Sequence, residues 1–405
     1  MGNSRIANLG TVITGSTPSS NNPELFGDVY PFITPTDIGS GRTVNTSRKL
    51  SEAGYKKFNT RMLPPLSVCF VCIGATIGKI CMTSEYSLTN QQINSIVVDT
   101  SRHNPYYVYY LLSTFAEKVA SIAGGAATPI VNKTNFENIK ASMPSLFLQN
   151  KIATILSAYD DLIENNLRRI KTLEEMAQNL YREWFVNFRF LGYENARFVD
   201  SPLGEIPEGW RVENLFSIAD VTYGYAFKSS LFNTDGLGKP VVRIRDVLSG
   251  VSKTFTTEEP NKKYLVENGD ILVGMDGDFH MGFWVGGQAY LVQRVARFRA
   301  KKDIGTYLLF LSLIDPIKRF NSTITGTTVA HLGDKHLKTI NILLPDKEFL
   351  SYCNSILESY LGLIISLKLK NGVLQKTRDL LLPKLISGEL DVSNLDINLP
   401  EEVSA

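Results

Sequence analysis

Apolar side chains recur every seven residues from Leu148 to Phe185, along a stretch that contains neither glycine nor proline. A stripe with this period faces a partner helix, whereas the wider stripe of a 3.6-residue period faces a globular core. We therefore predict one long helix that forms half of a coiled coil. Its expected seam residues are Ile152, Leu156, Tyr159, Ile163, Asn166, Ile170, Leu173, Ala177 and Leu180. The polar Asn166 could set the register of the pair.

The same spacing returns between Leu350 and Leu381, and the two stretches superpose in one register about 201 residues apart. Tyr159 then falls on Tyr360, which two unrelated helices would not be expected to show. We predict that the two helices pair with each other, with two unrelated surface helices as the alternative. The second set of seam residues is Leu350, Cys353, Leu357, Tyr360, Ile364, Leu367, Leu374 and Leu381.

The second helix is less regular than the first. Asn371 and Arg378 stand at seam positions that match Ile170 and Ala177. Polar side chains in a seam weaken the packing of the two helices. We therefore expect the pair to splay at this end, or to bind another subunit there.

The segments before the two helices also repeat. Short β-branched runs and glycine turns fill both, and KPVVRIRDVLSG (239–250) matches YPFITPTDIGSG (30–41) in length, aspartate position and final Ser-Gly. Asn214-Leu215 is matched with Asn8-Leu9. We predict an α+β fold in which two α/β domains, in a pseudo-twofold arrangement, are separated by an antiparallel coiled coil. The expected segments are a first domain (1–147), a central helix (148–190), a linker (191–209), a second domain (210–346), a C-terminal helix (347–388) and a tail (389–405).

This arrangement has a geometric consequence. A helix of roughly 35 residues is about 50 Å long, and B-DNA advances about 34 to 36 Å per turn. Two different domains held on such a spacer could contact one face of a duplex at sites about a turn apart. One polypeptide could then recognise a split, asymmetric DNA sequence.

Composition sets broad limits. The 405 residues suit two or three domains, and the net charge of +2 with 43% hydrophobic residues is ordinary for a soluble protein. The N-terminus lacks a signal-peptide core and no apolar run reaches the length of a membrane span. We expect a cytoplasmic protein that is not membrane-bound. A basic cluster in the first domain could face phosphates, or could be a solvated loop: Arg42, Arg48, Lys49, Lys56, Lys57 and Arg61.

Motifs for catalysis are missing from the sequence. It has no Walker loop, G-x-S-x-G or H-E-x-x-H, and its four histidines are not spaced as metal ligands. The pair Cys69 and Cys72 lies in a strand-like run without a second pair, so we interpret both as structural. The tetrapeptide that begins at Asn104 resembles the N-P-P-Y of amino-methyltransferases but lacks the second proline, and we expect a helix start there. We predict no catalytic, cofactor-binding or metal-binding residue.

Longer stretches carry a family resemblance. LGEIPEGW (203–210), NLYREWFVNFRF (179–190) and LLPKLISGEL (381–390) resemble the specificity subunit of Type I restriction-modification systems. The resemblance implies two target recognition domains joined by conserved helices in a non-catalytic chain. It also implies double-stranded DNA, two methyltransferase subunits and restriction subunits as partners. S-adenosylmethionine, ATP and Mg²⁺ would then belong to the partner subunits and none to this chain.

Candidate DNA contacts are basic and polar residues in loops after predicted strands. Arginine can recognise guanine, and an acidic side chain can accept from the cytosine amine. The candidates are Arg42, Lys49, Lys56, Lys57 and Arg61 in the first domain, and Arg243, Arg245, Asp276, Asp278 and His280 in the second. The target bases do not follow from the sequence, because readout depends on loop geometry. A free-standing DNA methyltransferase and a coiled-coil scaffold that does not bind DNA are the alternative functions.

Overall fold

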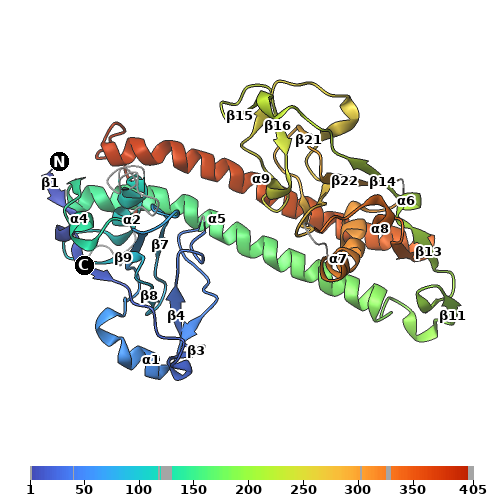
Figure 1. Ribbon diagram of the computed structural model, residues 1–405, viewed down its shortest axis with the longest axis horizontal. Coiled ribbons are helices and arrows are strands. Elements are labelled where there is room, and N and C mark those ends of the chain that lie inside the picture. The colour runs from blue at the N-terminus through green and yellow to red at the C-terminus, as the bar shows by residue number, and fades with distance from the viewer. Residues whose placement is uncertain are drawn as a thin grey trace. The chain divides into compact units, whose positions relative to one another are not determined.

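The computed structural model describes residues 2–39, 41–116, 119, 130–301, 303–324 and 330–399 (Figure 1). The chain forms two compact units. Unit 1 comprises Met1–Asn165 and Asn371–Ala405, and unit 2 comprises Asn166–Lys370. Each unit therefore contains one globular domain and one half of each long helix.

The domain of unit 1 contains two small sheets. The first is antiparallel, in the order β2 (Gly10–Thr14), β9 (Ile93–Val98), β6 (Val68–Val71), β7 (Ile80–Met82). The second has the order β3 (Phe26–Gly27), β5 (Lys49–Leu50), β4 (Tyr30–Ile33), β8 (Leu88–Thr89), with β4 and β8 parallel. The remaining elements are β1 (Gly2–Arg5), paired with β10 (Lys140–Met143), and the helices α1 (Glu52–Lys57), α2 (Pro105–Ser113) and α4 (Lys133–Glu137).

The domain of unit 2 repeats this topology, with one further strand, β18, at the edge of its second sheet. Its first sheet has the order β14 (Ala219–Tyr223), β22 (Val295–Ala300), β19 (Ile271–Gly274), β20 (Met281–Phe283). Its second has the order β15 (Phe232–Asn233), β17 (Phe255–Thr256), β16 (Lys239–Val242), β21 (Ala289–Leu291), β18 (Leu265–Val266), with β16 and β21 parallel. The remaining elements are β13 (Arg211–Asn214), paired with β23 (Asn341–Leu344), and the helices α6 (Leu215–Ile218), α7 (Thr306–Thr323) and α8 (Asp334–Leu337).

Hydrogen bonds confirm the predicted repeat at single residues. The Asp37 carboxylate accepts the backbone N–H of Thr34 at 2.8 Å, and the Asp246 carboxylate accepts that of Arg243 at 3.0 Å. The aspartates that the sequence match aligned therefore close the same turn after β4 and after β16. In both domains this turn follows a strand that has a parallel neighbour: β4 pairs with β8, and β16 pairs with β21.

The match of Asn214-Leu215 with Asn8-Leu9 is wrong. The N–H of Leu215 donates to the Ile340 carbonyl just as the N–H of Ile6 donates to the Ile139 carbonyl. The partner of Asn214-Leu215 is therefore Arg5-Ile6. The strand ladder fixes this alignment, whereas two letters in common between short segments do not.

The two long helices are α5 (Leu146–Tyr181), which continues into a π-helical turn (Arg182–Val186), and α9 (Lys347–Ser387). Their first residues are 201 positions apart, as the heptad register predicted. In unit 2 an ion pair joins Lys368 to Glu174 at 3.6 Å, and the ring of Phe349 lies 5.4 Å from that of Trp184. Residue numbers thus rise along one helix and fall along the other, so the two helices are antiparallel.

The inner faces of the two helices hold the expected seam residues. Eleven of the seam positions described above are buried in α5 and α9, with Asn166 among them, and the other six are half-buried. The buried positions are Ile152, Leu156, Ile163, Asn166, Ile170, Ala177, Leu350, Cys353, Leu357, Ile364 and Leu367, and the half-buried positions are Tyr159, Leu173, Leu180, Tyr360, Leu374 and Leu381.

Splaying at the end of α9 does not occur. In unit 1, Nδ2 of Asn371 is buried and donates to the Ile163 carbonyl oxygen at 3.4 Å. The Arg378 guanidinium forms an ion pair with Asp160, whose other carboxylate oxygen accepts the Tyr110 hydroxyl at 2.5 Å. The polar seam residues thus bind α5 instead of weakening the pair.

Two further segments are more ordered than expected. The predicted linker contains an antiparallel hairpin of β11 (Phe198–Ser201) and β12 (Gly204–Pro207). The tail packs in unit 1, where Nζ of Lys151 donates to the carbonyl oxygens of Ser393 and Leu395 at 2.7 Å each.

Among the described helices, α9 alone is long and apolar enough to span a membrane, with a best window of mean hydropathy 1.2. Its apolar residues include Leu350, Leu357 and Ile364, which are buried in the core of unit 2. This spacing is the one expected of an internal helix that packs on a partner.

Candidate nucleic-acid interface

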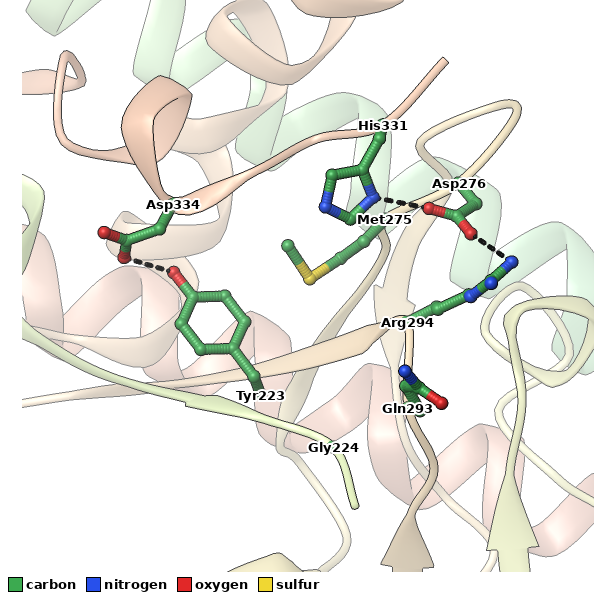
Figure 2. Close-up of a pocket in the computed structure, with 8 residues that line it drawn as sticks. All are labelled: Tyr223, Gly224, Met275, Asp276, Gln293, Arg294, His331 and Asp334. Atoms are coloured by element: carbon green, nitrogen blue, oxygen red, sulfur yellow. Dashed lines mark hydrogen bonds and ion pairs between the residues drawn. The ribbon is translucent and has the colours of Figure 1, made fainter. Parts of the chain in front are cut away.

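A cavity of about 680 Å³ opens at one end of the first sheet of unit 2 (Figure 2). It lies where β14 and β19 end and β22 begins, so three loops and the segment before α8 converge on it. Its lining residues are Tyr223, Gly224, Met275, Asp276, Gln293, Arg294, His331 and Asp334.

Asp276 holds two exposed side chains at the rim of this cavity. One carboxylate oxygen accepts a hydrogen bond from Nδ1 of His331 at 2.6 Å, and the other forms an ion pair with Nη1 of Arg294 at 2.8 Å (Figure 2). The Asp276 side chain is 12% exposed, whereas those of Arg294 and His331 are 62% and 60% exposed. A half-buried carboxylate that holds one charge-assisted hydrogen bond and one ion pair restricts the orientation of both partners. The result is a fixed arginine and a fixed imidazole that both face solvent.

The backbone holds this network in place. The N–H of Leu332 donates to the Met275 carbonyl at 2.8 Å, which places His331 beside Asp276. The N–H of Met275 donates in turn to the Arg294 carbonyl at 2.8 Å. Arg294 has a φ of 72°, a left-handed conformation that is rare outside glycine. Such strain persists where the surroundings impose it, and it concentrates at functional sites.

A second polar pair lies on the other side of the cavity. The Tyr223 hydroxyl donates to Asp334 at 2.7 Å, and Lys338 forms an ion pair with Asp334 at 2.6 Å. Burial and the hydrogen bond to Asp334 raise the pKa of Tyr223. The hydrogen bonds from Lys338 and Tyr223 lower the pKa of Asp334. The phenol therefore remains protonated and the carboxylate ionised at neutral pH.

Unit 1 repeats the backbone of this site. The N–H of Val131 donates to the Cys72 carbonyl at 2.9 Å, and the N–H of Cys72 donates to the Gln92 carbonyl at 2.8 Å. Ile73 bridges to Ile130 as Asp276 bridges to His331. These bonds match those of unit 2 one for one, so they align the two sites residue by residue.

The side chains at the matched positions differ in charge. Gln92 stands where unit 2 has Arg294, and two isoleucines, Ile73 and Ile130, replace the aspartate and the histidine. The Gln92 amide oxygen accepts the Asn90 amide at 2.9 Å. One scaffold thus carries a charged network in unit 2 and uncharged side chains at the three matched positions of unit 1.

The predicted basic residues of unit 1 fall into two groups. Lys56 and Lys57 are exposed in the last turn of α1, Lys49 is half-buried on β5, and Arg61 is exposed. Arg61 donates through Nη1 to the Gly15 carbonyl at 3.4 Å. The N–H of Gly15 donates to Ile93 as that of Gly224 donates to Val295, so Arg61 lies near the counterpart of the cavity. Contact of these four side chains with DNA stays a prediction.

Arg42 belongs to the second group, because it is buried at 8% exposure against α5. Its Nη2 lies 2.5 Å from Asp161 and 3.8 Å from Glu164, and its guanidinium lies 5.0 Å from the Tyr106 ring. This placement makes Arg42 a contact between the domain and α5 in unit 1, and not one of the exposed side chains expected to face phosphate.

The predicted residues of unit 2 are spread over two places. Arg243 and Arg245 both donate to the Thr254 hydroxyl, in the turn after β16. Exposed Asp278 and half-buried His280 lie in the turn between β19 and β20. Of the five, only Asp276 lines the cavity.

Sequence reasoning missed the other members of the network. Arg294 and His331 lie far from Asp276 in the chain, the histidine 55 residues away. The signal that could have identified Arg294 is the match of LVQRVARFRAK with TNQQINSIVVD, in which an arginine replaces a glutamine.

The tetrapeptide at Asn104 is the structural helix start that the sequence predicted. The Asn104 side chain accepts the N–H of Tyr107 at 3.1 Å and so caps α2. Its backbone N–H donates to Gln149 of α5 at 3.0 Å. Cys69 lies on β6 and Cys72 directly follows it, and the two side chains pack in different apolar clusters. Within the ranges described above, no three His, Cys, Asp or Glu side chains gather closely enough to hold a metal ion.

Comparisons with known proteins agree with this architecture. A family model described as the Type I restriction modification DNA specificity domain matches residues 1–175 and again residues 207–371. The MjaIX Type I restriction enzyme specificity subunit of Methanocaldococcus jannaschii is 28% identical over 413 residues, covering 96% of this chain and 94% of the relative. The EcoBI specificity subunit of Escherichia coli is 30% identical over 196 residues, covering 47% of this chain and 41% of the relative. The crystal structure of a Type I S subunit from M. genitalium aligns with a TM-score of 0.59 at 16% identity, covering 95% of each chain, and shows the same fold.

Proposed function

This chain belongs to the Type I restriction modification DNA specificity domain family, and we propose from that premise that it selects the DNA target of a Type I restriction-modification complex. Each globular domain recognises one half of a split target. Catalysis lies in other subunits, and this chain supplies recognition only.

The observation that carries this proposal is the repeated site. Two domains with matching strand registers present different side chains at the same place, as Gln92 and Arg294 show. Recognition of two different half-sites by one repeated scaffold requires this combination of a constant backbone and variable base-contacting groups. Exposed Lys56 and Lys57 would add contacts to phosphate, which position a domain on the duplex without selecting the sequence.

The paired helices set the distance between the half-sites and bind the methyltransferase subunits. One half of α5 and one half of α9 belong to each unit. The length of the helices therefore sets the spacer between the half-sites. Their outer faces also carry matched apolar side chains, Leu162 in unit 1 and Leu363 in unit 2, which are 51% and 48% exposed. One methyltransferase subunit docks on each of these faces. S-adenosylmethionine, ATP and Mg²⁺ are bound by the methyltransferase and restriction subunits.

Methylation mapping tests the recognition role. A host that carries this chain with the methyltransferase of its complex should show a split motif with one methylated adenine in each half, and deletion of this chain alone should abolish it. A methylation pattern that survives the deletion would rule out the proposal.

The spacer role has its own test. Insertion of seven residues into both helices lengthens each by about 10 Å, which corresponds to about three base pairs. We expect both half-sites to stay the same and the spacer between them to grow by about that length. An unchanged spacer would contradict the proposal that the helices set it.

A further inference from the structure

The matched cavities of the two units indicate which base each unit recognises at one position. We propose that Arg294 recognises a guanine in the half-site of unit 2, at the place where Gln92 recognises an adenine in the half-site of unit 1. This inference rests on the proposed function, since it requires that the loops around the cavity face DNA.

The geometry of Arg294 suits the edge of a guanine. Asp276 takes Nη1 at 2.8 Å and leaves Nε and Nη2 for a further pair of acceptors. The O6 and N7 atoms of guanine, side by side in the major groove, are the pair that an arginine fork fits. The side chain is 62% exposed although its backbone is fixed in a left-handed conformation. An exposed arginine that is held rigid loses little conformational entropy when it binds a planar partner.

The charge of the network favours a base over a phosphate. Asp276 neutralises Arg294, and its carboxylate would repel a phosphate placed beside the guanidinium. A phosphate contact depends on net positive charge and little on orientation. The half-buried carboxylate of Asp276 cancels that charge and orients the guanidinium, which a base contact needs.

The matched residue of unit 1, Gln92, also favours contact with a base over contact with a phosphate. Gln92 carries no charge, so a phosphate contact would have no equivalent at this position of the repeat. Glutamine and arginine are both side chains that recognise purines in the major groove, glutamine through N6 and N7 of adenine. Ile130, which bridges to Ile73 at the same site, is 53% exposed. An exposed apolar side chain there suits the methyl group of a neighbouring thymine.

Arg294→Ala tests the proposal in the full chain, assembled with its methyltransferase. We expect the half-site of unit 2 to lose its requirement for one G·C pair, with discrimination at that pair falling about 5- to 150-fold. Gln92→Ala should relax one A·T pair in the other half-site, at the same place counted from the spacer. Arg211→Ala is the matched control: this arginine is also in unit 2, is 49% exposed and has a carboxylate partner, Glu213, at 3.3 Å. It should leave the motif unchanged.

Duplexes with 7-deazaguanine identify the atom that is contacted. Binding of the wild-type complex should weaken when the analogue, which lacks N7, replaces the guanine in question, and binding of the Arg294→Ala complex should not weaken further. The ratio of specific to non-specific affinity is measured at a salt concentration where non-specific binding is still detectable. The affinity of a weak complex can then also be determined.

The possible outcomes separate the two proposals. If the wild-type motif depends on this chain but Arg294→Ala leaves it unchanged, the guanine contact is overturned and the recognition role stays intact. The same conclusion follows if Arg294→Ala weakens DNA binding equally at every sequence. A wild-type half-site without any G·C pair overturns the guanine contact as well. If no motif depends on this chain, the proposed function itself fails.

Discussion

The two units fasten their domains to the helices by different chemistry. In unit 1, Asp160 of α5 accepts the Tyr110 hydroxyl and pairs with Arg378, and it is 4% exposed. A shift of 201 residues, the offset of the helix starts, places Leu311, Leu361 and Ala177 at the matching positions of unit 2. All three lie in the apolar core of that unit. The same junction is therefore a buried charged triad in one unit and a hydrocarbon core in the other.

This difference shows that the fold does not require the charges. A buried ion pair is often no more stable than apolar residues of similar volume, although removal of one partner is costly. What the triad provides is a preference among partners, because Arg378 packs well only where an acidic residue faces it. A charged junction in one unit and an apolar one in the other discourages pairing of a helix half with the wrong repeat.

The largest expected effect comes from breaking the triad in unit 1. Asp160→Leu introduces the residue of unit 2 but leaves the Tyr110 hydroxyl without its acceptor and the half-buried Arg378 with only the exposed Asp379 as partner. This change should cost about 3 kcal/mol of the free energy of unfolding. Denaturant unfolding followed by circular dichroism measures this loss. All three tryptophans, Trp184, Trp210 and Trp284, lie in unit 2. A loss seen by circular dichroism with an unshifted fluorescence transition would place the damage in unit 1.

Replacing the whole triad should reverse this loss. The triple variant Tyr110→Leu, Asp160→Leu and Arg378→Ala copies the junction of unit 2 into unit 1. We expect a stability within about 1 kcal/mol of the wild type or higher, because no charge is left buried. A triple variant as unstable as Asp160→Leu would contradict this account of the junction.

A smaller effect is expected at Arg42. Its partners Asp161 and Glu164 match Gly362 and Ile365 of unit 2, so this charged contact also belongs to unit 1 alone. Asp161 is 61% exposed, which weakens the pair through solvent screening. Arg42→Ala should cost about 1 kcal/mol, including the lost contact with Tyr106. The cost, measured by denaturant unfolding, should shrink at high salt.

Arg42 and the lysines of α1 should differ in DNA binding. Lys56→Ala should reduce the slope of log affinity against log salt by about one, as measured by titrations of the assembled complex at several salt concentrations. Arg42→Ala should leave that slope unchanged, because its side chain is buried. A reduced slope in Arg42→Ala would show that this arginine reaches phosphate.

The smallest effect is the pH dependence that His103 contributes in unit 1. Burial lowers the pKa of His103, and the matching residue of unit 2 is Ile304. The unfolded chain therefore binds the proton first as the pH falls, so the stability from neutral His103 is present above its ordinary pKa and lost below it. Unfolding free energies at about pH 7.5 and about pH 5.5 should differ less in His103→Ile than in the wild type. An equal difference would exclude His103 as a source.

The sequence predicted the long helices and the repeat because both are periodic patterns. The heptads of α5 and α9 and the shared aspartates, Asp37 and Asp246, are visible in the letters themselves. The hairpin of β11 and β12 was missed because its strands are rich in the residues that usually mark a linker. The roles of Arg42 and Arg294 were missed for another reason: their partners, Asp161 and Asp276, are brought to them only by the fold.

The most direct measurement of the central claim uses a chain with two copies of the first domain. Residues 2–165 replace residues 211–366, as the strand registers align them, and Ala177→Arg supplies the arginine that the transplanted Asp160 and Tyr110 require. If each unit recognises its own half-site on antiparallel helices, methylation mapping should give an inverted repeat of the half-site of unit 1. A motif that keeps the second half-site of the wild type, or that becomes a direct repeat, would contradict the account.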